Sequence, residues 1–172
     1  SKAEAFTPQL FEINGWRVAV FAFAEFVEFE SWYATADRAG VASGKDLRAV
    51  TRAIRRFDRL VDVVAVSIHW GIERTFVLSS AQTNGAAAMV EAGADVIFGH
   101  HPHRVQALRR VDEAPVFYSL GNFVWFHLGG AASDSAVGRV TFRRNGTDRA
   151  CLLDARITRP GRVVLEDDKH CV

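Results

Sequence analysis

Ala94-Asp95-Val96-Ile97-Phe98-Gly99-His100-His101-Pro102-His103 is the stretch of sequence that decides the fold of this chain and points to a site. Its first half is a short apolar run with β-branched and aromatic residues that closes on a glycine, which is typical of a buried strand. Three of the six histidines of the chain follow directly. The carboxyl end of such a strand is where α/β folds place ligands and catalytic groups. Core packing gives no reason for this clustering, whereas metal coordination does.

Length and composition predict one globular domain. A chain of 172 residues with 49% hydrophobic and 24% charged residues can bury a sizeable core. The net charge of +1 argues against a general nucleic-acid or anionic-membrane binder. The apolar runs fall short of the roughly 20 residues of a membrane span. The first residues, Ser1-Lys2-Ala3-Glu4-Ala5, show no signal peptide.

The order of apolar patterns along the chain predicts strands alternating with helices. Runs that are apolar on both faces indicate buried strands, and apolar residues at helical spacing indicate helices. The expected strands cover residues 15–23, 61–68, 94–98 and 115–120, and the expected helices cover 45–60 and 81–92. Ser43 with Asp46 resembles a cap for the first helix, and Ser79 with Gln82 forms a capping box for the second. Residues 25–44 are expected to be an irregular connection.

A β-hairpin is predicted near the carboxyl end, where Asn145-Gly146 separates runs at 139–142 and 150–153. No repeat or linker divides the chain, so we expect one α/β domain of strand-helix-strand units followed by the hairpin. Its expected parts are a lead-in at 1–14, a motif-bearing α/β part at 15–126, and the hairpin with a terminal strand at 137–165.

Two further features are open to more than one interpretation. The arginines of the 45–60 helix could form a polyanion surface, but the balanced net charge favours a plain solvated face. Cys151 and Cys171 have neither CxxC nor zinc-knuckle spacing, so a disulfide between them is possible but weakly supported. The cysteines therefore indicate no compartment.

Three of the expected strands end in the same way, with polar side chains beside a glycine. They end in His69-Trp70-Gly71, in residues 99–103 and in Ser119-Leu120-Gly121-Asn122. If the strands are parallel, as the strand-helix-strand order implies, their carboxyl ends share one crevice. His69, His101, His103 and Asn122 would then converge.

Metal ligation is the favoured role for His101 and His103. In extended backbone a His-x-His pair points both rings to one side, and Pro102 stiffens the turn. The alternative is a pair of hydrogen-bonded structural histidines. His69 is assigned as a further ligand, against a buried hydrogen-bonded histidine. His100 projects away from His101 by the same alternation, so packing explains it as well as ligation does.

The remaining candidates are Glu73 and Asn122. Glu73 could orient a ligand histidine or act as an acid or base, or be a plain surface glutamate. Asn122 could offer an amide oxygen ligand or cap the turn. His127 and His170 lack partners in the sequence and are expected at the surface. Neither a nucleophile elbow nor a phosphate-binding glycine loop is present. Four aromatic residues are expected in the core or the pocket wall: Trp70, Phe123, Trp125 and Phe126.

At these residues the chain resembles the bacterial capsule-synthesis, or poly-γ-glutamate biosynthesis, family of calcineurin-like metallophosphoesterases. The matching pieces are Val66–Glu73, Ala92–His103 and Phe117–Phe123, in the family's order and spacing. The similarity extends from about Glu12 to Phe123. It implies the second half of a metallophosphoesterase-like α/β sandwich.

The resemblance also implies a chemistry. His69 looks like the family's isolated histidine ligand, and His101 and His103 look like its paired ligands in a dinuclear centre of Mn, Zn or Fe. Such a centre would activate water against a phosphoester or a γ-glutamyl amide. The residue between Gly99 and His101 varies in the family, and the role of the position matching Asn122 is less clear.

Several pieces of the family pattern do not occur in this chain. The family's Gly-Asp strand and its Asn-Leu-Glu and Asn-Asn-His segments, which supply carboxylate and amide ligands, are absent. The expected partner is therefore the missing amino-terminal half of the same fold, and we expect weak or single-metal binding and little hydrolysis by this chain alone. Arg74 replaces a common aromatic residue and Arg104 a common aliphatic one, which is expected to alter substrate preference.

Two classes of function follow from the resemblance. The chain belongs to a metal-dependent hydrolase if the other half is present, acting on an anionic polymer or a small molecule. Alternatively, it is a non-catalytic, polymer-binding component of a membrane-associated synthesis or export assembly. Either class implies a cell-envelope or extracellular location and no nucleic-acid partner. An unrelated histidine-metal hydrolase would require the three matching motifs to be accidental.

Overall fold

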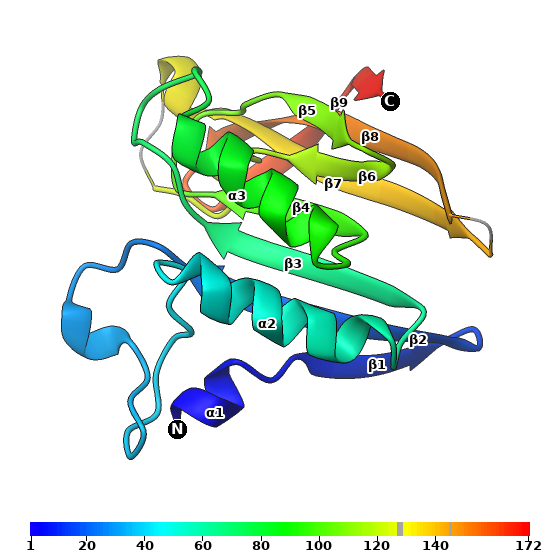
Figure 1. Cartoon of the computed structure of the whole chain (residues 1–172). Helices are drawn as coiled ribbons and strands as arrows, with labels where there is room; N and C mark the ends of the chain where they lie inside the picture. Colours follow the sequence, from blue (N-terminus) through cyan, green and yellow to red (C-terminus); the bar gives the residue numbers. More distant parts are fainter. Residues whose placement is uncertain (127–128, 145) are drawn as a thin grey trace.

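The computed structural model describes residues 1–126, 129–144 and 146–172, and it contains two β-sheets and two longer helices (Figure 1). The six-stranded sheet has the order β1-β2-β3-β4-β6-β5, and the three-stranded sheet has the order β7-β8-β9. The helices are α1 (Lys2–Ala5), α2 (Leu47–Asp58) and α3 (Ser80–Glu91), with short 3-10 turns at Glu30–Trp32 and Gly130–Ala132. The strands are β1 (Gln9–Ile13), β2 (Trp16–Ala24), β3 (Val63–His69), β4 (Val96–His100), β5 (Leu108–Val111), β6 (Ala114–Phe117), β7 (Asp134–Arg143), β8 (Gly146–Arg159) and β9 (Arg162–Cys171).

The four strands predicted from apolar runs form the parallel centre of the larger sheet. β2, β3, β4 and β6 are parallel neighbours, with Ala24 beside His69 and His69 beside His100 in the register. β1 and β5 pair antiparallel at the two edges and were not predicted, and neither was α1. The α/β class and the parallel order are therefore confirmed.

The structure confirms the predicted cap of α3 and corrects the predicted cap of α2. At α3 the capping box of Ser79 and Gln82 is present. At α2 the prediction was wrong, because the cap is Asp46, whose carboxylate accepts hydrogen bonds from the backbone N–H groups of Arg48 and Ala49. The Ser43 hydroxyl instead accepts from the N–H of Lys45, before the helix begins. An aspartate placed two residues ahead of the second helical N–H group is well positioned as a cap.

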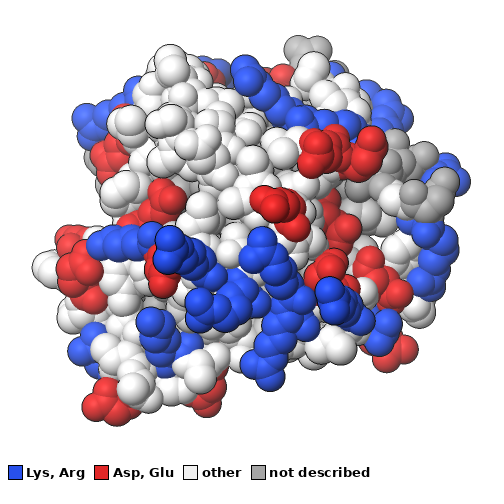
Figure 2. Space-filling model, in the orientation of Figure 1, with Lys and Arg blue, Asp and Glu red and all other residues white. Residues whose placement is uncertain are grey.

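One face of the six-stranded sheet is covered by α2 and α3 (Figure 1). Phe21, Val66 and Ile97 project from the strands into this layer, where they meet Ile54 of α2 and Met89 of α3. All five side chains are almost fully buried. The α2 arginines turn outward, and Figure 2 shows the basic side chains spread over the surface of this helix. The solvated face predicted for them is thus what the structure has.

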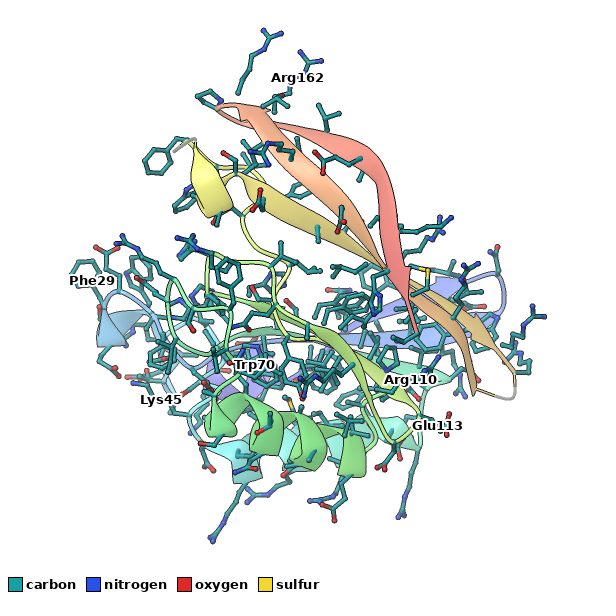
Figure 3. All side chains as sticks on the ribbon, turned by 90° about the horizontal axis from the view of Figure 1, so that it is seen from above. Phe29, Lys45, Trp70, Arg110, Glu113 and Arg162 are labelled. Carbon is teal, nitrogen blue, oxygen red and sulfur yellow. A yellow bond between two sulfur atoms is a disulfide. The ribbon has the colours of Figure 1, made fainter. Side chains whose placement is uncertain are left out.

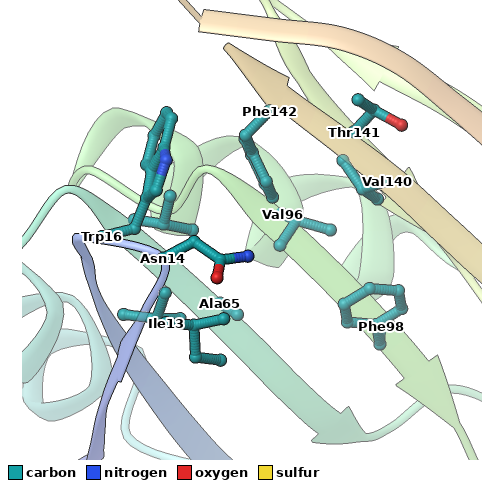
Figure 4. Close-up of a pocket in the computed structure, with 11 residues that line it drawn as sticks. Ile13, Asn14, Trp16, Ala65, Val96, Phe98, Val140, Thr141 and Phe142 are labelled. Carbon is teal, nitrogen blue, oxygen red and sulfur yellow. The ribbon is translucent and has the colours of Figure 1, made fainter. Parts of the chain in front are cut away.

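The three-stranded sheet lies on the other side of the six-stranded sheet (Figure 3). Phe117 of β6 and Val96 of β4 pack there against Ala136 and Leu152 of β7 and β8. Coverage stops short of β1 and β2. A pocket of about 520 Å³ opens between these strands and β7, with apolar walls that include Val18, Ala65, Phe98 and Phe142 (Figure 4).

The predicted hairpin is the β7-β8 pair, and β9 extends it to three antiparallel strands. Gly146 is the first residue of β8 and pairs with Arg143; Asn145 lies outside the described residues. Cys151 and Cys171 are register partners on β8 and β9 and form a disulfide. Across the helices of the described ranges, none has the length and apolarity to cross a membrane.

Candidate metal centre

The carboxyl ends of β3, β4 and β6 meet at one edge of the six-stranded sheet, because these strands are parallel neighbours. The segments that follow them carry the predicted site residues, and the structure brings these residues together. A pocket of about 510 Å³ opens at this edge. Its lining consists of Phe26, Val27, Glu28, His69, Glu73, His101 and His103.

Three side chains form a group whose ligand atoms could hold one metal ion. One ligand atom each of Glu73, His101 and His103 lies within 4.8 Å of the other two. His69 is not part of this group among the described residues, but its ring centroid is 4.5 Å from that of His101. The structure therefore adds Glu73 to the predicted histidine pair and places His69 beside them.

The backbone at the two paired histidines is not extended, so the predicted reason for their alignment was wrong. His101 has φ of +99° and His103 has φ of +53°. Residues other than glycine rarely adopt these φ values, and those that do are concentrated at functional sites. Tertiary hydrogen bonds hold the turn: the N–H of Trp70 donates to the carbonyl of His100 at 3.0 Å, and the N–H of Arg74 to the carbonyl of Pro102 at 2.7 Å. Two left-handed residues bring the rings together here, in place of an alternating strand.

Asn122 fixes the orientation of His103. This buried side chain donates through Nδ2 to the carbonyl of Ala132 at 3.0 Å, so its Oδ1 faces His103. His103 Nδ1 lies 2.6 Å from that oxygen and must be the donor. Nε2 of His103 is then left as the atom with a free lone pair, which is the arrangement that outer-shell partners impose on metal-binding histidines. In this geometry Asn122 positions His103.

The surroundings of His69, His100 and His101 favour the neutral form of their imidazoles. Burial, followed by the neighbouring charges of His101, His100 and His103, lowers the pKa of His69 to about 4. Burial also lowers the pKa of His101 and of His100. A histidine must be neutral to ligate a metal, so these rings are ready to bind an ion at neutral pH.

His100 lies on the same sheet face as His69. The two are register partners, and paired residues of parallel strands project to one side. His100 is outside the Glu73-His101-His103 group, and repulsion between charged His69 and His100 rings would contribute to the lowered pKa of His69. Its side chain borders the histidine cluster.

Close packing under the site depends on Gly99 and Trp70. Trp70 is fully buried between the sheet and α3 (Figure 3), and its indole N–H donates to the carbonyl of Tyr118 at 2.9 Å. A Cβ added at Gly99 would collide with that carbonyl and with the indole nitrogen. The absence of a side chain at Gly99 therefore lets β4, β6 and the loop after β3 approach one another.

The loop that carries Glu73 is fastened from below by two buried glutamines. Gln106 donates to the carbonyl of Thr75 at 3.0 Å and accepts from Gln82 of α3 at 2.9 Å. Glu73 itself is exposed at the rim of the pocket. Its carboxylate is thus free to meet an ion or a substrate while its backbone is held in place.

Sequence reasoning missed the contribution of the segment after β2. Glu25 follows this strand directly, and its backbone N–H donates to the carbonyl of His69 at 2.8 Å. Burial raises the pKa of the Glu25 carboxyl, and a backbone hydrogen bond from Gly71 partly opposes this. Phe26 stacks on His101, with ring centroids 5.1 Å apart. The strand-end rule would have found Glu25 if it had been applied to β2.

The other predicted residues lie around or away from the site. Trp125 lies against His103, with ring centroids 5.0 Å apart, and lines an adjoining pocket with Phe126. Phe123 is exposed, so the predicted core or wall role was wrong for this residue. His170 is exposed on β9, opposite Leu152. His127 lies outside the described residues.

Comparison with known proteins identifies a family over most of the chain. The model of the family described as "Bacterial capsule synthesis protein PGA_cap" matches residues 1–126. The capsule biosynthesis protein CapA of Bacillus anthracis is 38% identical over 139 residues, which are 78% of this chain and 33% of that protein. The PGA biosynthesis protein CapA of Bacillus subtilis is 33% identical over 138 residues, which are 80% of this chain and 36% of that protein.

A solved structure shares the fold. It is a Staphylococcus aureus protein described as a candidate 5'-nucleotidase in complex with alpha-ketoglutarate. The match has a TM-score of 0.51 at 14% identity and covers 94% of this chain and 30% of that one. This chain therefore spans about a third of the length of these relatives.

Proposed function

Since the chain belongs to the bacterial capsule synthesis protein family, we propose that it carries the histidine half of a metal-dependent hydrolase site used in capsule or poly-γ-glutamate biosynthesis. The observation that supports this most directly is the group of Glu73, His101 and His103 at the sheet edge, with His69 beside it. The bond attacked would be a phosphoester or a γ-glutamyl amide.

The donor set fits a divalent ion of the Mn, Zn or Fe type. Two imidazole nitrogens and one carboxylate oxygen suit these metals, and burial lowers the pKa of His101, which favours the neutral ring that a metal ligand must be. Because His103 Nδ1 donates its hydrogen to Asn122, the lone pair of His103 Nε2 is available to bind the metal. A bound ion of this kind would supply Lewis-acid activation of water and of the scissile group.

The side chains around this centre have separable roles. His101 and His103 would hold the ion, and Asn122 would keep His103 in one tautomer. Glu73, exposed at the rim, would complete the ligand set or take a proton from the attacking water. His69 would ligate a second ion once carboxylates from elsewhere in the fold are present. The site residues of this chain thus account for one ion and half of a second.

The missing carboxylates would come from the rest of the longer fold. The apolar pocket beside β1 and β2 leaves the second face of the sheet incompletely covered, and its walls include half-buried Val18 and Ala65. Because the matched part of this chain covers only about a third of these relatives, we propose that the amino-terminal half of the fold lies on this face. That position borders the histidines, which end the same strands.

A non-catalytic role in a synthesis or export assembly is the second candidate. It is favoured by two exposed apolar side chains at the site: Phe26 lines the histidine pocket, and Phe126 lines the adjoining pocket. Such side chains could seat a partner protein or a polymer without hydrolysis. For either role we propose a location at the cell envelope, supported by relatives named for capsule or PGA biosynthesis and by the Cys151–Cys171 disulfide, which suits an oxidising compartment.

Metal binding tests the site. We expect the 172-residue chain to bind about one Mn²⁺ or Zn²⁺ by calorimetry, and we expect His101→Ala or His103→Ala to abolish this binding. Asn122→Ala should weaken it by about tenfold or more, because His103 loses its orientation. His170→Ala, an exposed histidine on β9, is the matched control and should change nothing.

Activity of the full-length protein separates the two candidates. Hydrolysis of a generic phosphoester or of poly-γ-glutamate that is lost in His101→Ala and His103→Ala would support the hydrolase. Hydrolysis that persists unchanged in both variants would reject the metal-site assignment. Polymer binding without any hydrolysis would favour the assembly role. Tight binding of two ions by the isolated chain would contradict the half-site.

A further inference from the structure

A second pocket, of about 590 Å³, adjoins the histidine group and shares Glu73 and His103 with it. Arg74 and Arg104 both line this pocket, together with Trp125. We propose that the two arginines form an oxyanion subsite, which binds a phosphate or carboxylate group of the ligand whose scissile bond lies at the histidines. In naming that ligand the inference rests on the proposed function.

The backbone holds both arginines beside the histidine turn. The N–H of Arg74 donates to the carbonyl of Pro102 at 2.7 Å, so the loop after β3 is fastened to the loop after β4. Nη1 of Arg104 donates to the carbonyl of His103 at 2.6 Å. That bond uses one of the five N–H donors of Arg104 and leaves the others for a ligand.

The described residues provide no acidic partner for either guanidinium. Within that part of the chain, no carboxylate oxygen lies within 4.0 Å of Arg74 or Arg104, whereas Arg144 and Arg156 have such partners. Glu73 is the one carboxylate of the pocket lining, and it also belongs to the metal-binding group. With an ion at that group, the pocket wall carries two uncompensated positive charges.

The polar groups of the pocket favour an anion over a neutral ligand. Both polar atoms of the Asn122 side chain are already used, by His103 and by the carbonyl of Ala132. The two guanidinium groups are the cationic donors of this wall, and the described residues give neither of them an acidic partner. A guanidinium matches the planar, bidentate geometry of carboxylate and phosphate groups. Trp125, packed on His103, forms an aromatic wall beside them.

The test is calorimetric binding of two probes to the 172-residue chain, carried out on chelator-treated protein and again with saturating Mn²⁺, which would neutralise the Glu73 carboxylate of the same pocket. The probes are inorganic phosphate and a γ-linked glutamate dipeptide. We expect one or both to bind, and the double variant Arg74→Asn/Arg104→Gln to weaken binding by about tenfold or more, because charge-assisted hydrogen bonds are lost. Asparagine suits Arg74 because φ there is +59°, which asparagine tolerates.

Two further variants keep the result interpretable. Arg52→Gln removes an exposed arginine from α2, on the helix side of the sheet, and should leave binding unchanged. Arg104→Lys retains the charge without the planar fork and should weaken binding less than Arg104→Gln. If the double variant does not fold by circular dichroism, Arg74→Asn alone, at an exposed position, carries the test.

The outcomes separate this inference from the proposed function. Preference for phosphate or for the dipeptide identifies the source of the oxyanion, and either supports the subsite when binding depends on the arginines. Binding of neither probe at millimolar concentration, or equal binding by the double variant, would overturn it. Metal titration of the same samples is independent: metal binding without arginine-dependent anion binding rejects only the subsite. Arginine-dependent anion binding without metal binding rejects only the metal site.

Discussion

The two faces of the six-stranded sheet are completed to different degrees by this chain. On the helix side, Phe21, Val66 and Ile97 are sealed beneath α2 and α3. On the other side, β7 and β8 cover β4 and β6, while Val20 on β2 and Ala65 on β3 stay half-buried. The same strands thus contribute alternate residues to a finished core and to an open apolar surface.

This difference explains where the candidate site lies. His69 and His100 project from the incompletely covered face, at the edge where the strands end. A site on the sealed face would be closed to substrate by the helices. The helices of this chain stabilise one face of the sheet, and under the proposed function other parts of a longer protein would complete the face that carries the site. Substitutions and pH can test that division, and the largest effect is expected at the glycines.

A glycine-to-alanine substitution should destabilise the protein much more on the helix side of the sheet than on the opposite side. Gly99→Ala would place a Cβ against the carbonyl of Tyr118 and the indole of Trp70, which cannot move aside. We expect a loss of about 3 kcal/mol or more in the free energy of unfolding, measured with urea. Gly138→Ala, on β7, would instead meet the side chains of half-buried Phe98 at 2.8 Å and of Phe117 at 3.2 Å and no backbone atom, so a smaller loss of about 1 kcal/mol is expected. Equal losses would contradict a more rigid helix side.

Removing methyl groups should show the same asymmetry at smaller magnitude. Val66→Ala opens a cavity in the helix-side core and should cost about 2–3 kcal/mol. Val20→Ala makes the same chemical change on the open face and should cost less than about 1 kcal/mol, because this side chain is partly exposed. Urea midpoints of the two variants provide the comparison. A larger loss at Val20 would mean that the open face is covered in solution.

Acid should act on the open face, where the histidines titrate. The pKa of His69 is about 4 in the folded chain against an ordinary 6.5, so between these pH values the unfolded chain binds more protons. Stability must then rise with pH across this window and fall as pH is lowered from 6.5 toward 4. The lowered pKa values of His100 and His101 act in the same direction. The melting temperature of chelator-treated protein should therefore rise with pH between 4 and 6.5, and His69→Asn should make this rise smaller. An unchanged rise in that variant would contradict the lowered pKa of His69 as its cause.

The parallel strands were predictable from sequence and the edge strands were not. Apolar residues on both faces of a strand, as in β3 and β4, produce a continuous apolar run, and a run this short between turn residues is typical of a central strand. β1 and β5 have no such pattern: every residue of β1 is exposed, and β5 contains two arginines in four residues. An edge strand is defined by pairing with its neighbour, in this case β2 or β6, and local composition does not record a tertiary contact of that kind.

At the site, the identity of the residues was predictable but their geometry was not. Parallel strand ends predicted the convergence of His69, His101 and His103, because topology alone places them at one edge. The left-handed φ values of His101 and His103 contradict local propensity and are imposed by hydrogen bonds from distant loops. The role of Asn122 depended on the partner of its amide nitrogen, which only the contact with Ala132 reveals.

The disulfide between β8 and β9 has a mechanical consequence. The two strands form a hairpin around a tight turn, and Cys151 and Cys171 join its open end. An antiparallel hairpin pulled at its open end ordinarily unzips one hydrogen-bonded pair at a time. Here a pull transmitted along the chain at Val172 would reach the Cys171 bond after one residue and pass directly into β8. The load would then be carried in shear by the β7-β8 pairing, so the disulfide keeps the β8-β9 hairpin from unzipping when this end of the chain is pulled.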